Sequence, residues 1–514
     1  MFDYVIVGAG SAGCVLAARL SEDPAVQVLL LEAGPPDHSQ NIHVPLGFTR
    51  NFRTQFDWDL ATHPEPQLQR RRIYLPRGRT LGGSSSINAM IYIRGNRADY
   101  DGWGCEGWAF DDLLAYFKRA EDNERGADEL HGAGGPMQVA DGRSRNPIAA
   151  AFIEAAVQAG LRRNEDFNGL EQDGAGWYQA TQRNGRRCSA AVAYLHPALS
   201  RPNLVVRTGA QVHRVVLDEL RATGVAGERY GEPFAAGAGR EVIVCAGAYA
   251  SPQLLMLSGI GAVASLERAG VAPVHDLPEV GRNLQDHLSA GVTWGTDEPV
   301  SLLVARLEPE RCMRELLESG SGPLTSCIAE AGAFDRTDAG LAVPDLQLHA
   351  VPAAYPDEGL GEIVGHGTTL TVAVLTPRSR GQVTLASDEP TAKPRIEHHY
   401  LSEPVDVQRT IAGVRRLLEI AAQPALARYA VRRHGLPTSD SDAAILAYVR
   451  ATAQTLYHPV GTCAIGTVVD EGLRVRGTEG LRVIDASVMP LIPRGNTNAP
   501  TIAIAERAAD LLKA

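Results

Sequence analysis

The fold is decided by residues 2–13, which read Phe2-Asp3-Tyr4-Val5-Ile6-Val7-Gly8-Ala9-Gly10-Ser11-Ala12-Gly13. The apolar run before Gly8 predicts a buried strand, and the apolar pattern from Cys14 to Leu20 predicts a helix. A second apolar strand, Val26 to Leu31, ends at Glu32. This βαβ order favours an α/β fold built on a buried parallel sheet.

The three glycines and Glu32 have the arrangement of a dinucleotide site. Gly8 permits a tight turn, Gly10 lets the backbone approach a pyrophosphate, and Gly13 lets helix and strand pack closely. The free N–H groups of the helix N-terminus attract the anion. Glu32, 19 positions beyond Gly13, is placed to bind an adenosine ribose. A glycine-rich turn without a ligand is the alternative, and the spacing does not separate FAD from NAD.

The bulk composition excludes several classes of protein. With 514 residues we expect two domains. A formal net charge of −11 disfavours nucleic acid as a partner. Seven scattered cysteines without a CxxC pair predict reduced thiols in a cytoplasmic protein. We expect no targeting leader and no transmembrane segment, and peripheral contact with the inner membrane is left open.

Further elements are expected along the chain. Residues 35–77 lack periodicity and predict a long ordered excursion over the cofactor. Short strands are expected at Leu204–Arg207, Glu241–Cys245 and Leu481–Asp485, and a helix at Thr501–Leu512. Residues 225–240 predict a hairpin or a surface loop.

Three further segments carry a resemblance to a known family. The first is Gly78-Arg79-Thr80-Leu81-Gly82-Gly83-Ser84-Ser85-Ser86-Ile87-Asn88, and the second runs from Gly247 to Gly261. The third is Tyr457-His458-Pro459-Val460-Gly461-Thr462-Cys463, followed by Asp485–Pro490 and Gly495–Thr501. Together they resemble the glucose–methanol–choline oxidoreductases, most of all bacterial FAD-dependent alcohol dehydrogenases, with choline dehydrogenases somewhat further away. Residues 290–375 match only loosely.

The resemblance implies FAD as cofactor. Some relatives tether the flavin to a histidine where this chain has Ile87, so binding should be noncovalent. Val212 would contact the adenine, and Asp485 with Ala486 the flavin's phosphate and ribityl portion. The full set of expected cofactor-binding residues is Gly8, Gly10, Ser11, Ala12, Gly13, Glu32, Ala33, Arg79, Leu81, Gly83, Ser84, Asn88, Ala89, Met90, Ile91, Val212, Ala246, Gly247, Asp485, Ala486, Asn496 and Thr497.

The same resemblance implies a Rossmann-like FAD-binding domain interleaved with a substrate-binding domain on an antiparallel sheet. We expect the FAD-binding domain to comprise residues 1–155, 200–290 and 455–514. The substrate-binding domain would comprise 156–199 and 291–454. As sequence modules, residues 1–295 correspond to the family's N-terminal part and 375–510 to its C-terminal part.

Alcohol oxidation needs a group that accepts the hydroxyl proton, and we expect His458 to be this base. Asn496 stands where relatives carry histidine or asparagine, and its amide would donate a hydrogen bond to the developing alkoxide. His287, His349, His398 and His399 lack metal-ligand spacing, so structural or surface roles are expected and no metal site. Ser84–Ser86 lack the GxSxG elbow of a hydrolase.

The expected reaction is the oxidation of a small to medium, fairly apolar primary alcohol to its aldehyde, with hydride passing to flavin N5. Aromatic residues make up only 6% of the chain, and no cluster of Trp or Tyr is evident near the motifs, so a cage for quaternary ammonium is not indicated. Electrons would pass to a quinone or another carrier. An oxidase that uses oxygen and a cyanohydrin lyase of the same fold remain as alternatives, and a flavoprotein without catalysis is disfavoured.

Overall fold

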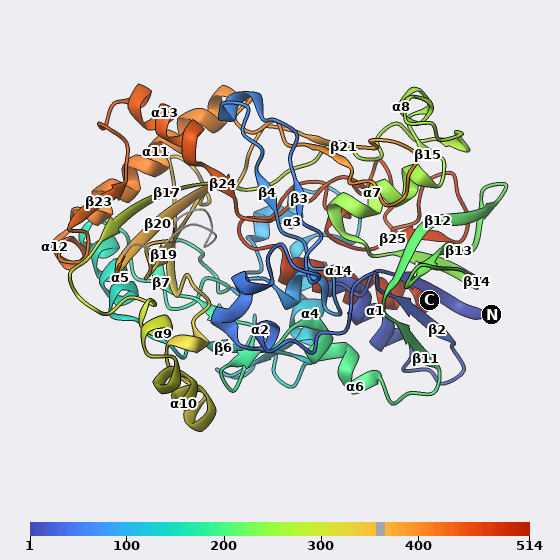
Figure 1. The fold of residues 1–514 in the computed structure, drawn as a ribbon, viewed down its shortest axis with the longest axis horizontal. Coiled ribbons are helices and arrows are strands. Elements are labelled where there is room, and N and C mark those ends of the chain that lie inside the picture. Colours follow the sequence, from blue (N-terminus) through green and yellow to red (C-terminus); the bar gives the residue numbers. More distant parts are fainter. Residues whose placement is uncertain (356–364, 514) are drawn as a thin grey trace.

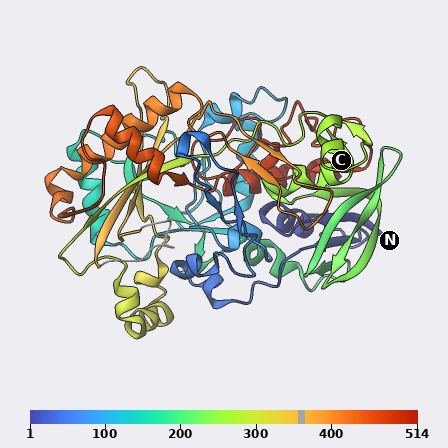
Figure 2. The same cartoon turned by 45° about the horizontal axis from the view of Figure 1, so that its top comes forward.

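The computed structural model describes residues 1–355 and 365–513. Two large sheets lie toward opposite ends of the long axis (Figure 1). Figure 2 shows the same separation from a second direction, with both chain termini at the end that holds the first sheet. Segments from early, middle and late parts of the sequence lie between the two sheets (Figure 1 and Figure 2).

The first sheet is built on β1 (Phe2–Val7), whose Val5 and Ile6 are completely buried. Its parallel strands follow the order β11 (Leu204–Arg207), β2 (Val28–Leu31), β1, the end of β14 (Glu232–Val244) and β25 (Leu481–Val483). The first half of β14 instead pairs antiparallel with β13 (Arg221–Arg229), and β13 with β12 (Ala210–Asp218). This confirms the α/β class.

The N- and C-terminal helices pack together on the first sheet's side of the molecule. Helix α1 (Ser11–Leu20) contacts α14 (Asn498–Lys513), which also contacts α4 (Phe110–Ala120). The carboxylate of Glu506 is completely buried between them and pairs with Arg19 and Arg119, each at 2.8 Å. Because a buried carboxylate needs such partners, this cluster fixes α14 against α1 and so fixes the loop that precedes α14.

The second sheet is antiparallel throughout. Its strands follow the order β23 (Arg432–Gly435), β17 (Leu288–Gly295), β20 (Gly367–Val374), β19 (Leu346–Val351), β18 (Ala331–Asp335) and β7 (Gly174–Trp177). Strand β24 (Gln454–Thr455) also pairs with β17. Helices α5 (Pro147–Gln158) and α11 (Pro404–Ala421) contact this sheet and each other. The expected antiparallel second sheet is confirmed.

The remaining helices and strands lie outside the two large sheets. They are α2 (Gln40–His43), β3 (Leu60–Ala61), β4 (Tyr74–Leu75), α3 (Arg97–Asp101), β5 (Glu121–Asn123), β6 (Met137–Asp141), β8 (Gln179–Ala180), β9 (Gln182–Arg183), β10 (Arg186–Arg187), α6 (His196–Ala198), α7 (Gly247–Leu257), β15 (Ile260–Gly261), α8 (Val263–Arg268), β16 (His275–Asp276), α9 (Val304–Leu307), α10 (Pro309–Ser319), β21 (Gln382–Thr384), β22 (Arg395–Glu397), α12 (Pro424–Ala427) and α13 (Asp442–Thr452), with 3-10 turns at η1 (Pro45–Asn51) and η3 (Gly83–Ser86) among others.

The sequence located most of these elements but not all of their ends. Helix α1 begins at Ser11 rather than Cys14, because it starts within the glycine turn. Strand β2 begins at Val28 rather than Val26, and β25 ends at Val483 rather than Asp485. Residues 225–240 do form a hairpin, between β13 and β14. Residues 35–77 hold only short elements, as expected.

Candidate active site

A continuous pocket extends from the carboxyl end of β1 to the face of the second sheet. Most of the residues expected to bind cofactor or substrate line it. These are Gly8, Gly10, Ser11, Ala12, Glu32, Ala33, Gly83, Ser84, Asn88, Ala89, Met90, Ile91, Val212, Ala246, Gly247, His458, Asp485, Ala486, Asn496 and Thr497. Segments 8–33, 83–91, 246–247 and 458–497, far apart in sequence, therefore meet at one site.

Gly13, Arg79 and Leu81 do not line the pocket. A Cβ at Gly13 would overlap the carbonyl oxygen of Gly8, so Gly13 serves the close packing of α1 on β1. The Arg79 guanidinium lies over the Trp58 ring, 5.2 Å from its centre, and it is Trp58 that faces the pocket. Leu81 is buried, and its carbonyl accepts a hydrogen bond from Ser86.

At the β1 end, the geometry fits a dinucleotide. Gly10 precedes α1 and supplies no side chain to cap it, so the helix N-terminus is left for an anion. A Cβ at Gly83 would lie 2.7 Å from the Cα of Gly10, which shows how closely the loop of η3 approaches this turn. The Glu32 carboxylate is held by the N–H groups of Ala9 and Gly34, each at 2.9 Å, and burial raises its pKa to about 7.

Asp485 joins two of the segments that carry the motifs. One carboxylate oxygen accepts hydrogen bonds from the backbone N–H of Gly247, at 2.8 Å, and from the hydroxyl of Ser251. The other accepts the N–H of Ser487 at 2.8 Å. Asp485 therefore fixes the start of α7 at the pocket wall.

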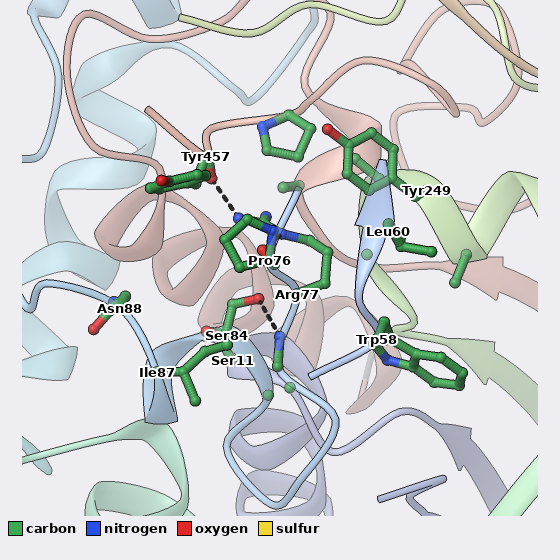
Figure 3. A pocket seen from close by; sticks show the side chains of 18 of the residues that line it. Ser11, Trp58, Leu60, Pro76, Arg77, Ser84, Ile87, Asn88, Tyr249 and Tyr457 are labelled. Atoms are coloured by element: carbon green, nitrogen blue, oxygen red, sulfur yellow. Dashed lines mark hydrogen bonds between the residues drawn. The ribbon is translucent and has the colours of Figure 1, made fainter. Parts of the chain in front are cut away.

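Arg77 crosses the middle of the pocket. Figure 3 shows its guanidinium donating to the carbonyl of Tyr457, at 2.8 Å, while the hydroxyl of Ser84 accepts the N–H of Gly78, at 3.2 Å. Asn88 and Ile87 lie on the side of Tyr457, and Trp58 and Leu60 on the opposite side. The pocket thus has one end near Trp58 and another near Tyr457, which directly precedes His458 in the sequence (Figure 3).

His458 and Asn496 meet at this second end. The Nδ2 of Asn496 lies 3.2 Å from the Nε2 of His458. The amide oxygen of Asn496 accepts a hydrogen bond from Gln347 at 3.4 Å, which leaves the NH2 group directed to the imidazole. Both side chains line the pocket, so a hydroxyl bound there can meet one acceptor and one donor at once.

A second histidine fixes the tautomer of His458. The Nε2 of His287 lies 3.1 Å from the carbonyl of Leu375, which can only accept, so this nitrogen carries the proton. The other nitrogen of neutral His287 is then an acceptor, and it lies 3.0 Å from the Nδ1 of His458. His458 must donate from Nδ1, and its Nε2 is left as a lone-pair acceptor facing the pocket.

Burial keeps both histidines neutral. Desolvation lowers the pKa of His287 to about 4. It also lowers the pKa of His458 well below its usual value, helped by the neighbouring His287 and His349 and by Arg77. Asp286 holds the backbone beneath them, accepting the N–H groups of His287 and His458 at 2.9 and 2.8 Å. The imidazole of His458 is therefore a neutral proton acceptor in a fixed orientation.

Two more polar side chains near this end were not foreseen from the sequence. His349 lines the pocket, and neither of its nitrogens has a partner among the described residues. The amide oxygen of Gln347 is also without one. Desolvation lowers the pKa of His349 to about 3. Structural or surface roles were expected for these histidines: His287 is buried behind His458, His349 lies at the pocket wall, and His398 lies in the core, stacked on Tyr400.

The walls around His458 are apolar and aromatic. They are formed by Phe48, Phe52, Ile87, Met90, Ile91, Ile328, Ala329, Val351, Tyr355 and Tyr457. The rings of Phe48 and Phe52 lie 5.8 Å apart, and those of Phe52 and Tyr457 6.4 Å. The sequence shows no evident cluster of Trp or Tyr near the motifs, but the fold gathers aromatic residues from distant loops, with Phe48 and Phe52 beside Tyr457. Of the described lining residues, only Glu32 and Asp485 are carboxylates.

Within the described ranges, no group of histidine, cysteine and acidic residues has the geometry of a metal site. No helix among them combines the length and hydropathy needed to cross a bilayer. All seven cysteines are free thiols.

Comparison with known proteins gives a consistent result. The two sequence models of GMC oxidoreductases match residues 2–289 and 377–505. An alcohol dehydrogenase (acceptor) of Pseudomonas putida is 44% identical over all of this chain and 96% of its own length. An oxygen-dependent choline dehydrogenase of Paraburkholderia phytofirmans is 44% identical over 99% of this chain and 94% of its own. The structure of pyridoxine 4-oxidase from Mesorbium loti superposes with a TM-score of 0.91, at 33% identity, over 99% of each chain.

Proposed function

Since the chain belongs to the GMC oxidoreductase family, we propose that it oxidises a small to medium, fairly apolar primary alcohol to the aldehyde. As a member of this family it is an oxidoreductase that acts on CH–OH donors, with FAD as cofactor. The observation that carries the proposal is the pair His458 and Asn496, with Nε2 and Nδ2 3.2 Å apart at one end of the pocket.

When bound, FAD supplies the acceptor for the hydride that leaves the carbinol carbon. The residues that would hold it are the glycine turn before α1, Glu32 and the loop of η3, which together leave room for a backbone-bound pyrophosphate. Binding would be noncovalent, since Ile87, which packs with Phe48 and Phe52, offers no nucleophile. Acid precipitation should release the yellow chromophore into the supernatant, and colour that stays with the pellet would contradict this.

The two polar side chains divide the work on the hydroxyl group. The Nε2 lone pair of His458 takes the hydroxyl proton, and the relay through His287 to Leu375 keeps that nitrogen unprotonated beforehand. The NH2 of Asn496 donates to the oxygen as negative charge develops on it. The C–H bond then breaks, its electron pair leaves with the hydrogen as hydride, and the C=O bond forms.

The walls favour an apolar substituent on the alcohol. Aromatic and aliphatic side chains surround the His458 end, and the carboxylates that line the pocket, Glu32 and Asp485, belong to the cofactor's segments. A quaternary ammonium group would meet aromatic faces there but, among the described residues, no counter-charge. Choline is the second candidate, because a choline dehydrogenase is among the relatives. A kcat/KM for benzyl alcohol or hexanol well above that for choline supports the proposal, and the reverse ranking contradicts it.

Electrons would pass on to a quinone or another carrier. The relatives' names include a dehydrogenase with an unspecified acceptor and oxygen-dependent enzymes, so an oxidase is the alternative. A cyanohydrin lyase would show cleavage without flavin reduction. To identify the acceptor, the flavin is first reduced anaerobically by an alcohol, and either oxygen or a quinone is then added. The compound that rapidly restores the yellow colour of the oxidised flavin is the acceptor. We place the protein in the cytoplasm, with peripheral contact to the inner membrane left open.

The domain division is also a proposal. Residues 1–155, 200–290 and 455–514 would bind FAD, and 156–199 with 291–454 would cover the substrate. It is supported by the strands of the first sheet, which lie within 2–31, 204–244 and 481–483.

A further inference from the structure

Arg187 is a buried cation without a carboxylate partner. Three arginines are buried among the described residues: Arg94, Arg187 and Arg482. Arg94 pairs with Glu121, and Arg482 pairs with Glu241 at 2.6 Å. No described carboxylate forms an ion pair with Arg187, and its Nη2 has no hydrogen-bond partner among the described residues. Removing a charge from water without a counter-charge is costly, so this position calls for an explanation.

The bonds that Arg187 does make lead to the pocket. Its Nε donates to the carbonyl of Ile42 at 2.7 Å, and its Nη1 to the carbonyl of Ser85 at 3.0 Å. The same Nη1 donates to the Oδ1 of Asn88 at 2.7 Å. That oxygen also accepts the N–H of Met90 at 3.0 Å. With Oδ1 engaged twice, the NH2 group of Asn88 is the free half of the amide, and Asn88 lines the pocket.

Asn88 belongs to the end of the pocket that holds His458. Its neighbour Ile87 packs with Phe52, and the Phe52 ring contacts Tyr457, which adjoins His458. Figure 3 shows Asn88 on the same side as Tyr457 and opposite Trp58. The reacting ring of a bound flavin would lie at this end, because His458, the proposed base, is there.

The charge is present under working conditions. Burial lowers the pKa of Arg187 to about 9, so the guanidinium remains protonated at neutral pH. Accepting one hydride brings two electrons and one proton to the flavin, which lowers its net charge by one unit. A reduced ring that gains no further proton therefore carries one negative charge, and a nearby buried cation stabilises it more strongly than an exposed cation would.

We propose that Arg187 is a positioning residue that turns the amide NH2 of Asn88 toward the flavin and supplies the positive charge that balances the reduced ring. This inference rests on the proposed use of FAD as hydride acceptor. It explains why a guanidinium is buried behind the cofactor loop without a carboxylate: an acid beside it would cancel the charge. A purely structural role, tying three loops together, would need only the hydrogen bonds.

The test is the two-electron midpoint potential of the bound flavin, measured by dye equilibration. Asn88→Asp places a carboxylate on Arg187 without removing any of its bonds. We expect it to shift the reduction equilibrium at least tenfold toward the oxidised form, which is about 30 mV for a two-electron couple. Arg187→Met should shift the midpoint potential in the same direction. Arg187→Lys keeps the positive charge but not the planar guanidinium, and its midpoint potential should stay close to that of the wild type.

Arg201→Met is the matched control. Arg201 also binds the main chain, at Ala18, and the hydroxyl of Ser21, but neither Ala18 nor Ser21 lines the pocket, whereas Asn88 does. We expect no shift from it. The inference would be overturned if Asn88→Asp and Arg187→Met both kept the wild-type midpoint potential, or if Arg201→Met showed an equal shift. If Arg187→Met does not fold, Asn88→Asp and Arg187→Lys still decide between the outcomes. The absorption spectrum of the wild-type protein shows directly whether it binds flavin. If it binds none, the proposed function is overturned as well.

Discussion

The Nδ1 atoms of His287 and His458 lie 3.0 Å apart, with their rings perpendicular. Only one of two such nitrogens can carry a proton in a hydrogen bond. Because the opposite nitrogen of His287 donates to Leu375, the shared proton belongs to His458. The pair therefore determines which nitrogen of the candidate base faces the pocket, before any substrate binds.

Replacing His287 tests this relationship. His287→Leu removes the acceptor for Nδ1–H, so His458 can adopt the tautomer with a proton on Nε2. We expect slower anaerobic flavin reduction, by less than the roughly 10²–10⁴-fold that loss of a general base costs, with unchanged FAD content. His287→Gln offers an amide oxygen as the acceptor and should recover part of the rate. Equal rates for the Leu and Gln variants would contradict the tautomer argument.

The pH dependence of flavin reduction follows from the lowered pKa of His458. The active form is neutral imidazole, so activity is present above the pKa and is lost as the pH falls through it. Because burial and the neighbouring histidines lower this pKa, the acid limb should lie below pH 6.5, the ordinary value. Stopped-flow reduction across a pH series measures it. A half-maximal rate at or above pH 6.5 would show that His458 is not the titrating group.

Substitution of Gly83 tests the close approach of the η3 loop to the glycine turn before α1, where we propose that FAD binds. Its φ is +53°, and a Cβ would lie 2.7 Å from Gly10. Gly83→Ala should push the two loops apart and lower the ratio of flavin to protein absorbance. Gly104→Ala is the control, since its φ of +65° imposes similar backbone strain with no atom within 4 Å. Strain alone costs about 1–2 kcal/mol. Full flavin occupancy in Gly83→Ala would argue against the loop contact.

The sequence predicted the parts of the site that are local. The turn at Gly8, the helix after it and Glu32 lie within a few dozen residues, and strand alternation with glycine spacing is enough to place them. His458 and Asn496 came from motifs shared with a family. His287 could not be found in this way, since it lies 171 positions from His458 and reaches it through the pairing of β17 with β24.

The aromatic wall was missed for a related reason. Phe48 belongs to η1 and Phe52 directly follows it, while Tyr355 follows β19 and Tyr457 follows β24. None of these segments has a periodicity that places it beside another. Their meeting depends on tertiary contacts of residues 35–77, such as that of η1 with η5 (Pro323–Thr325), which composition and local pattern do not encode.

The most direct test of the account is anaerobic flavin reduction by a panel of primary alcohols, in wild type, His458→Ala and Asn496→Ala. We predict that an apolar alcohol reduces the wild-type flavin and that His458→Ala slows this about 10²–10⁴-fold with FAD retained. Asn496→Ala should slow it about 10²–10³-fold, as for loss of one oxyanion donor. The account would be contradicted if His458→Ala reduced its flavin at the normal rate. It would also be contradicted if no alcohol reduced the wild-type flavin while the enzyme cleaved a cyanohydrin.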